Sequence, residues 1–266
     1  MSRLTTRFAA LKEEGRKALT TFITAGDPDL AATVPALHRL AEAGADVIEL
    51  GVPFSDPEAE GPAIQASSER GLANGTTLSK CIDMVREFRN TDDATPIVLM
   101  GYLNQILAMG PEAFAETAEQ AGVDGLIMVN LPPEEAPALK AALGSRDMDL
   151  IFLVAPTTTN ERLGDILEQA SGFVYYVSLK GITGADHLDV DSVAERVREI
   201  RAGTDLPVQV GFGIKDAASA RAVAAHADGV VIGSALVRTM GSEADAGARL
   251  DQLGSQVTEL RQALDA

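Results

Sequence analysis

Short apolar stretches alternate with amphipathic stretches along almost the whole chain. Leu30–Ala43, for example, repeats apolar side chains every three to four residues, which is the spacing of one helix face. The pattern predicts strands at Ala18–Thr24, Asp46–Leu50, Pro96–Met100, Leu126–Val129, Leu150–Val154, Phe173–Ser178, Val208–Gly211 and Gly229–Ile232. It predicts helices at Ser2–Glu14, Leu30–Ala43, Ala63–Ala73, Leu78–Asn90, Pro111–Ala121, Pro133–Leu143, Asn160–Ala170, Asp191–Arg201, Asp216–Ala225 and Ser234–Met240, with a closing surface helix in Glu243–Ala266.

The order of these elements indicates an α/β fold. Short, uninterrupted apolar strands between amphipathic helices are typical of a parallel sheet that is covered on its outside. Eight strand–helix units in 266 residues fit a closed (β/α)8 TIM barrel better than an open sheet. No G-x-G-x-x-G follows the first strand, so a dinucleotide-binding sheet has no support. We expect residues 1–266 to form a single TIM-barrel domain with an extra N-terminal helix.

The composition narrows the range of partners. Apolar residues make up 46% of the chain, and the formal net charge is −17. Nucleic acids and anionic membranes attract basic surfaces, so we expect neither as a partner, whereas backbone N–H groups can still bind a small phosphate. The N-terminal segment lacks the apolar core of a signal peptide, and no apolar run reaches the roughly 18 residues of a membrane span. We therefore expect a cytoplasmic protein.

Thiol and metal chemistry have little support. Cys81 is the single cysteine, so no disulfide can form within the chain, and its place in a predicted helix favours simple burial. His38, His187 and His226 show no metal-binding spacing, and we expect no metal site. His187 is better interpreted as a solvated loop residue than as a substrate contact. Lys180, past the sixth strand, leaves a Schiff-base aldolase as an alternative.

A carboxylate lies near the end of the second predicted strand. Glu49 belongs to the apolar run Asp46–Leu50, and the loop that follows is rich in Asp, Glu, Gly and Pro. Loss of water raises the pKa of a carboxyl group, which suits proton transfer near neutral pH. The strand carboxyl ends form the active face of a TIM barrel. Glu49 is therefore the first candidate for proton transfer, with structural pairing to an arginine or lysine as the alternative.

Glycine-rich segments follow the last predicted strands. Gly211 and Gly213 leave the seventh strand, and Gly233 with Ser234 leaves the eighth. Glycine lets the backbone approach a ligand, and helix N-termini present unpaired N–H groups to anions. Either motif alone is equally consistent with a simple strand end. Together with the GITG segment at Gly181–Gly184, they predict a phosphate site.

These motifs resemble those of the tryptophan synthase alpha chain family. The matching segments are FITAGDP, IELGVPFSDP, GPAIQ, GITGAD, GFGI and GSA, in the family's order over nearly the whole chain. ELGVPFSDP followed by GPAIQ is highly specific, whereas many phosphate-binding barrels share the glycine motifs. The resemblance implies a lyase that cleaves indole-3-glycerol phosphate to indole and glyceraldehyde 3-phosphate in tryptophan biosynthesis.

The resemblance also implies roles for individual residues. Glu49 matches the family's catalytic carboxylate, and Glu60 stands where a second carboxylate would accept the indole N–H. Tyr175 falls at a family tyrosine in the sixth strand, although its residue type also fits a core position. The expected indole contacts are Phe22, Met100, Tyr102, Leu153 and Phe212. The expected phosphate contacts are Thr183, Gly184, Gly211, Gly213, Gly233 and Ser234.

The family's partner is the beta chain, which carries pyridoxal phosphate. The resemblance therefore implies an alpha2-beta2 complex and no cofactor in this chain, with Asp56 and Asn130 at the partner interface or its loops. The sequence departs from the family at Glu60 and Asn130, each in place of aspartate, at Glu58 in place of an apolar residue, and at Leu179 in place of arginine. Glu60 keeps the charge but moves it by about one bond length, and positioning at that scale can cost on the order of 100-fold in rate. A stand-alone lyase, another phosphate-sugar barrel enzyme and a weakened, ligand-binding regulatory subunit are the alternatives.

Overall fold

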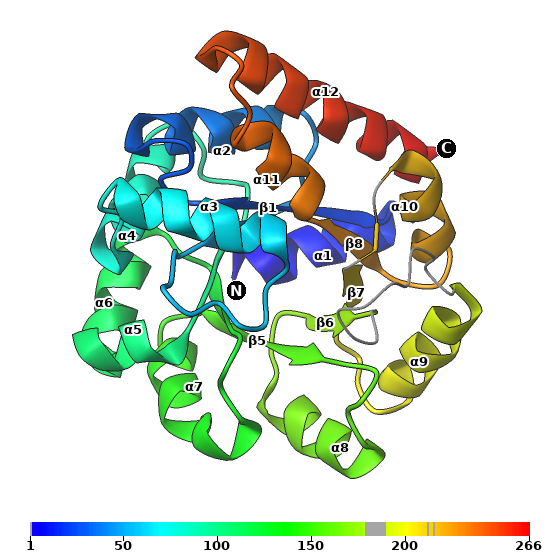
Figure 1. Cartoon of the computed structure of the whole chain (residues 1–266). Helices are drawn as coiled ribbons and strands as arrows, with labels where there is room; N and C mark the ends of the chain where they lie inside the picture. The colour runs from blue at the N-terminus through cyan, green and yellow to red at the C-terminus, as the bar shows by residue number, and fades with distance from the viewer. Residues whose placement is uncertain (1, 179–189, 212, 215) are drawn as a thin grey trace.

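A closed barrel of eight parallel strands forms the centre of the molecule (Figure 1). The computed structural model describes residues 2–178, 190–211, 213–214 and 216–266. Consecutive strands pair in chain order, and the eighth pairs with the first. They are β1 (Ala18–Thr24), β2 (Val47–Gly51), β3 (Ile97–Gly101), β4 (Gly125–Met128), β5 (Asp149–Val154), β6 (Val174–Val177), β7 (Val208–Gly211) and β8 (Gly229–Ile232). The predicted TIM barrel is confirmed, and each predicted strand end is correct to about one residue.

Successive residues of each strand point alternately into the barrel and toward the surrounding helices. In β2, Ile48 and Leu50 belong to the apolar layer between the strands and the helices. Val47 belongs instead to the apolar interior of the barrel. Glu49, two residues after Val47, therefore points inward. Its carboxyl group lies inside the barrel near the carboxyl end of the strand, as the active face requires.

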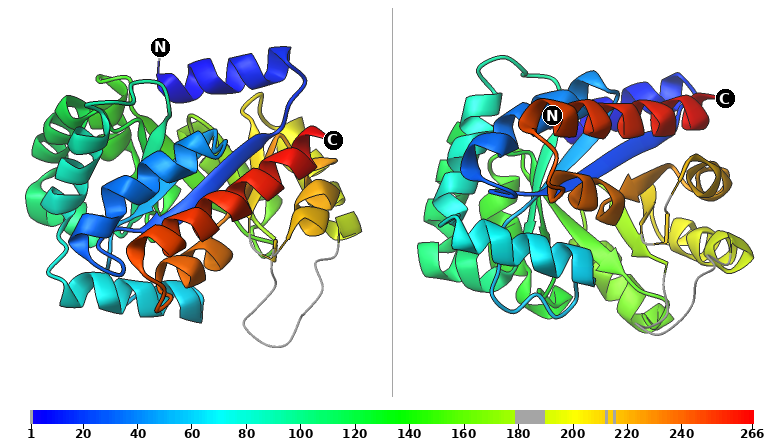
Figure 2. Two further views of the ribbon diagram at one scale, coloured as in Figure 1. Left: turned by 90° about the horizontal axis from the view of Figure 1, so that it is seen from above. Right: turned by 45° about the horizontal axis from the view of Figure 1, so that its top comes forward.

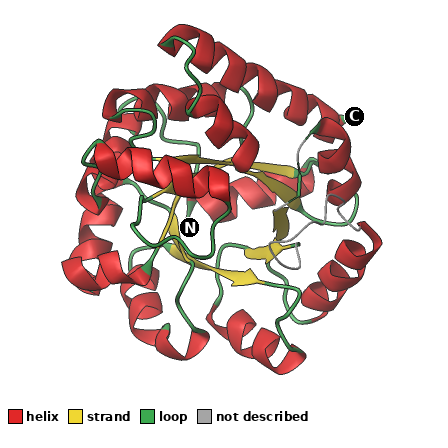
Figure 3. Ribbon diagram, viewed as in Figure 1, coloured by secondary structure: helices red, strands yellow, loops and turns green. Residues whose placement is uncertain are grey.

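Helices cover the outside of the barrel (Figure 3). They are α1 (Arg3–Glu13), α2 (Thr33–Glu42), α3 (Pro62–Ala73), α4 (Leu78–Phe88), α5 (Leu103–Met109), α6 (Pro111–Ala121), α7 (Pro137–Gly144), α8 (Asn160–Gln169), α9 (Val190–Ala202), α10 (Ala217–Ala224), α11 (Ser234–Met240) and α12 (Ala246–Asp265). The helices predicted to begin at Leu30 and Pro133 open instead with 3₁₀ turns. The sequence pattern does not predict α5, because seven residues are too few to show a helical repeat.

The predicted N-terminal helix closes the end of the barrel opposite to the strand carboxyl ends (Figure 2). Leu4, Phe8 and Leu11 recur on one face of α1 and are buried. Phe8 packs against Phe173 in the barrel interior, with ring centroids 5.7 Å apart. Burying each such side chain contributes roughly 1.5–3 kcal/mol. The helix therefore both stabilises the barrel and keeps water out of its interior at that end.

The composition of the closing helix predicts a surface element, but the structure shows that one of its faces is buried. Leu253, Val257 and Leu260 form a buried face of α12, which packs beside α2 and α10. Arg261 on the same helix is only 7% exposed. Among the described residues, no helix combines the length and the apolar character of a membrane-spanning segment.

Buried aspartates fasten the amino ends of the strands. Asp46 accepts the N–H of Leu19 at 2.8 Å and an Arg261 guanidinium N–H at 2.7 Å. Asp124 likewise accepts a strand N–H of β3 at 2.8 Å and an Arg89 N–H at 2.7 Å. These carboxylates bond neighbouring strands and outer helices together. Their role is structural, because every one of these contacts is made within the framework of the barrel.

Candidate active site

Glu49 is buried at the carboxyl end of the barrel. Only 1% of its surface is exposed, and neither carboxylate oxygen has a hydrogen-bond partner among the residues that the structure describes. Its neighbours in the strand register are Phe22 on β1 and Val98 on β3. No described arginine or lysine forms an ion pair with it, so structural pairing finds no support within these residues.

Glu60 brings a second carboxyl group to the same place. It lies in the loop between β2 and α3 and lines the same hollow as Glu49. Burial raises the pKa of the Glu60 carboxyl group to about 7. Burial, and then the nearby charge of Glu60, raise the pKa of Glu49 to about 8. Ionising one of these groups therefore disfavours ionising the other.

The carboxyl pair can hold one proton near neutral pH. Glu60 is the more acidic group and carries the charge, while Glu49 retains its proton longer. Environments that push the pKa values of two nearby groups apart are typical of an acid and a base with different tasks. The sequence-based expectation of a raised pKa for Glu49 therefore agrees with the structure in both direction and cause.

Apolar side chains form the walls of this hollow. Phe22 of β1 and Met100 of β3 line it, as the indole-site prediction requires, and both are buried. Ile64 of α3, Ile214 after β7 and Val231 of β8 complete the wall. Apolar surroundings of this kind suit a flat aromatic ligand and strengthen electrostatic interactions inside the site.

Tyr102 and Leu153 do not line the hollow that holds Glu49. Tyr102 lines an adjoining hollow that Glu60 also borders, and its ring stacks on Phe54 with centroids 4.5 Å apart. Leu153 pairs with Tyr175 in the strand register and packs at the edge of the barrel interior. It is not among the described residues that line either hollow.

Tyr175 extends from β6 into the hollow beside the carboxyl pair. Burial, followed by the charges of Glu49 and Glu60, raises the pKa of its phenol well above the ordinary value. The group is therefore a neutral O–H. Gly211 leaves room for it, because a Cβ at that position would lie 2.3 Å from the phenol oxygen. Tyr175 is thus both a core residue and a site residue. The lack of a side chain at Gly211 is explained by the packing of Tyr175 against it, without a phosphate ligand.

The segments after β7 and β8 also border this hollow. Gly213 has a φ of 76°, a backbone conformation that favours glycine. Gly233 is the N-cap of α11, and Ser234 is its first residue. All three line the hollow, so the structure brings these predicted phosphate contacts together. The other predicted ligand contacts in this region, Thr183, Gly184 and Phe212, lie outside the described residues.

Asp56 and Asn130 are exposed residues on the same end of the molecule. Asp56 accepts a hydrogen bond from the Ser55 hydroxyl at 2.6 Å. Asn130 accepts the N–H of Leu103 at 2.8 Å and donates to the Asn104 side chain at 3.1 Å, so it holds the start of α5. These contacts belong to loop structure, and the expected place at a partner interface stays a prediction.

Neither Cys81 nor His38 lies in the site. Cys81 is fully buried in α4, and burial raises the pKa of its thiol to about 12, which makes it unreactive as predicted. His38 stacks on Phe88 in the outer layer. His187 and Lys180 lie outside the described residues. Over the described ranges, no group of His, Cys, Asp and Glu side chains could hold a metal ion.

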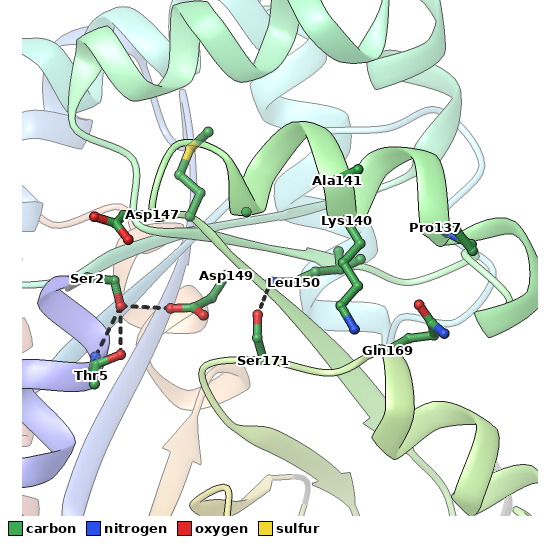
Figure 4. Close-up of a pocket in the computed structure, with 12 residues that line it drawn as sticks. Ser2, Thr5, Pro137, Lys140, Ala141, Asp147, Asp149, Leu150, Gln169 and Ser171 are labelled. Carbon is green, nitrogen blue, oxygen red and sulfur yellow. Dashed lines mark hydrogen bonds between the residues drawn. The ribbon is translucent and has the colours of Figure 1, made fainter.

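A much larger pocket lies at the opposite end of the barrel (Figure 4). Its volume is about 630 Å³, against about 60 Å³ for the hollow above Glu49. There the Ser2 hydroxyl donates to Asp149 at 2.8 Å, and the Ser171 hydroxyl accepts the N–H of Leu150 at 2.9 Å. The first bond docks α1 on the barrel, and the second ties β5 to the loop before β6. Size alone would therefore select the wrong end of the molecule.

Sequence reasoning missed part of the wall. Ile64 stands in the GPAIQ segment. Its position in the first turn of α3, directly after the acidic loop, could have identified it as a site residue. Val231 occupies an inward position of β8, two residues before Gly233, and strand alternation could have found it. Phe54 could not be found in this way, because loop side chains follow no periodic rule.

The chain matches a family model along nearly its entire length. Residues 8–265 match the model described as tryptophan synthase alpha chain. A relative of that name from Alkalilimnicola ehrlichii is 55% identical over 266 residues, which cover 100% of this chain and 97% of the relative. Another from Burkholderia ambifaria is 56% identical over 265 residues, with the same coverage of 100% and 97%.

Solved structures give the same result for the fold. Tryptophan synthase subunit alpha from Legionella pneumophila is 42% identical with a TM-score of 0.91, covering 100% of this chain and 99% of that one. Tryptophan synthase from M. tuberculosis gives 36% identity and a TM-score of 0.88, covering 99% of this chain and 100% of that one. Glu49, Glu60 and Tyr175 all fall within the matched residues. The chain therefore belongs to the tryptophan synthase alpha chain family.

Proposed function

We propose that this chain cleaves indole-3-glycerol phosphate into indole and glyceraldehyde 3-phosphate, with Glu49 as the group that transfers protons. As a member of its family, the chain is a carbon–carbon lyase of tryptophan biosynthesis. One observation carries the assignment of the chemistry. Two carboxyl groups, Glu49 and Glu60, share one apolar hollow at the strand carboxyl ends, and the oxygens of Glu49 have no described partner.

Glu49 suits both proton demands of this cleavage. The bond between indole C3 and the glycerol chain breaks after C3 takes up a proton, because the ring then accepts the bonding electrons. The neighbouring hydroxyl must lose its proton as the aldehyde forms. One carboxyl group that gives the first proton and takes the second returns to its starting state. A pKa of about 8 keeps Glu49 mostly protonated at neutral pH and ready for the first step.

Glu60 acts on the indole nitrogen in this proposal. Protonation at C3 places positive charge on that nitrogen, and an ionised carboxylate facing its N–H stabilises the charge. The lower pKa of Glu60, about 7, favours the ionised form. Tyr175 keeps its phenolic proton and offers a hydrogen bond to the reacting glycerol part of the substrate.

The rest of the hollow fits the two ends of the substrate. Phe22 and Met100 contact the indole ring, with Ile64 as an additional wall. Tyr102, Leu153 and Phe212 extend the indole site. Backbone N–H groups of Gly213 and Gly233, with the Ser234 hydroxyl, bind the phosphate from the opposite side. Thr183, Gly184 and Gly211 complete this phosphate site in the proposal.

A beta chain is the proposed partner, in an alpha2-beta2 complex in the cytoplasm. We assign pyridoxal phosphate to that partner and no cofactor to this chain. The rim of the barrel supplies a suitable surface, because Leu107 of α5 is 60% exposed and Asn130 holds the start of the same helix. The Gln105 side chain of the same helix donates to the Pro53 carbonyl at 2.9 Å, at the start of the acidic loop. A partner on α5 can therefore influence that loop.

Indole release from indole-3-glycerol phosphate tests the proposed function. The purified chain is assayed with and without a tryptophan synthase beta chain. We expect slow release by the chain alone and faster release with the partner. Absence of indole under both conditions, with phosphate-ligand binding intact, would refute the lyase and favour a regulatory subunit. Fast release that the beta chain does not change would favour a stand-alone enzyme.

A further inference from the structure

We propose that Gln65 is a positioning residue that holds Glu60 beside Glu49. The inference deepens the proposed function and rests on it, because it concerns the geometry of the same carboxyl pair. It assigns Gln65 no contact with the substrate. Its task is to fix the loop whose last residues bring the second carboxyl group into the hollow.

The side chain of Gln65 bridges both ends of the turn that carries Glu60. Its Nε2 donates to the Glu60 carbonyl oxygen at 2.9 Å and, less closely, to the Pro57 carbonyl oxygen at 3.5 Å. The Glu60 N–H itself donates to the Pro57 carbonyl at 3.0 Å and closes the turn. Besides the chain connection through Gly61, one side-chain amide therefore bonds both ends of the turn to α3.

The other end of this connection is rigid. The hydroxyl groups of Thr24 on β1 and Ser67 on α3 lie 2.6 Å apart in a buried hydrogen bond. One turn farther along α3, Arg70 donates twice to Asp27, at 2.6 Å and 2.9 Å. Since β1 pairs directly with β2 around Glu49, the helix is fixed relative to that residue. Gln65 extends this fixed geometry to the turn.

The carboxyl group of Glu60 has no comparable anchor of its own. Among the described residues, no hydrogen bond or ion pair is recorded for its carboxyl oxygens, and burial alone raises its pKa. The ionisable groups that interact with the pair are Tyr175 on β6, which feels both carboxyl groups, and Tyr102 after β3, which feels Glu60. The backbone of the turn therefore sets where the carboxyl group lies, and Gln65 is the side chain that holds that backbone.

Gln65→Met tests the proposal, because methionine keeps the length of the side chain and removes both N–H donors. We expect kcat for indole release to fall about 10- to 100-fold, the size of effect that misplacing a catalytic group produces, with a smaller change in KM. The pKa of Glu49, followed by carboxyl-detected ¹³C NMR on the ligand-free chain, should fall because the charge of Glu60 moves away. Gln65→Asn keeps the amide on a side chain that is one methylene shorter. Its kcat and its Glu49 pKa should lie between those of the wild type and Gln65→Met.

Asn74→Leu is the matched control. Asn74 also carries an amide that donates to two backbone carbonyls, those of Gly26 at 2.9 Å and Pro28 at 2.6 Å, but at the opposite end of α3. We expect this variant to lose stability while kcat per folded molecule and the pKa of Glu49 stay at their wild-type values.

Two results would overturn the proposal. One is a Gln65→Met variant whose kcat and Glu49 titration both equal those of the wild type. The other is an equal loss of kcat in Gln65→Met and Asn74→Leu, which would show a general structural effect. If the wild-type chain releases no indole, the proposed function fails, while the titration of the ligand-free variants still decides whether Gln65 positions Glu60.

Discussion

Buried carboxylates stand at both ends of this barrel, and their surroundings differ. At the amino end, Asp46 and Asp124 each accept a strand N–H and an arginine N–H. Burial raises the pKa of these two groups even so, because the bonded N–H groups and arginines only partly oppose it. At the carboxyl end, Glu49 has no described partner and meets a second carboxyl group. Burial therefore does not distinguish the reactive carboxylate from the structural one; the absence of a neutralising partner does.

Glu49→Gln should produce the largest loss of activity at the reactive end. Glutamine keeps the shape but cannot transfer the proton, so we expect kcat for indole release to fall about 100- to 10,000-fold. The variant should fold at least as stably, because it removes a group that ionises only at a cost inside the barrel. Initial rates and thermal unfolding give both quantities, and a rate close to that of the wild type would end the proposed role.

Arg261→Met should show the opposite behaviour at the structural end. It leaves Asp46 buried without the arginine that donates to it, so the free energy of unfolding should fall by about 3–5 kcal/mol. The rate per folded molecule should not change. Arg16→Met is the control, because the Arg16–Asp265 pair is more than a third exposed and contributes about 0–1 kcal/mol. Urea denaturation measures the free energy of unfolding of both variants. A loss of kcat in Arg261→Met would show that the structural and reactive ends of the barrel are not independent.

Glu60→Gln separates the two carboxyl groups of the reactive end. Loss of the charge that faces the indole nitrogen should lower kcat by roughly 100-fold. It should also lower the pKa of Glu49, because the charge of Glu60 contributes to raising it. Glu60→Asp should keep equal or higher activity if the longer side chain is a handicap. An unchanged Glu49 titration in Glu60→Gln would contradict the coupling of the pair.

Tyr175→Phe should have the smallest effect. The phenol is a neutral donor, so its removal should cost roughly 0.5–1.5 kcal/mol, or about two- to tenfold in kcat/KM. The loss should appear with little change in unfolding temperature, since the ring still fills the space beside Gly211. A loss as large as that of Glu49→Gln would instead give Tyr175 a direct part in proton transfer.

The sequence predicted the framework well because the framework is periodic. Apolar runs and helical repeats located the eight strands, and alternation within β2 explains why Glu49 points inward. The same rules could not find the contacts of Asp46 with Arg261, which lie 215 residues apart. They also could not show that Gln65 holds the turn of Glu60, because loop geometry depends on side-chain hydrogen bonds rather than on a repeat.

The pH dependence of kcat/KM for indole release tests the central claim most directly, since it reports the ionisation of the free enzyme. Activity requires Glu60 ionised and Glu49 protonated. It should therefore fall as pH drops through about 7, where Glu60 takes up a proton, and as pH rises through about 8, where Glu49 loses one. We predict a narrow bell-shaped profile whose alkaline limb moves to lower pH in Glu60→Gln. A kcat/KM that stays constant from well below pH 7 to well above pH 8 would contradict the assignment of Glu49 and Glu60 as the reactive groups.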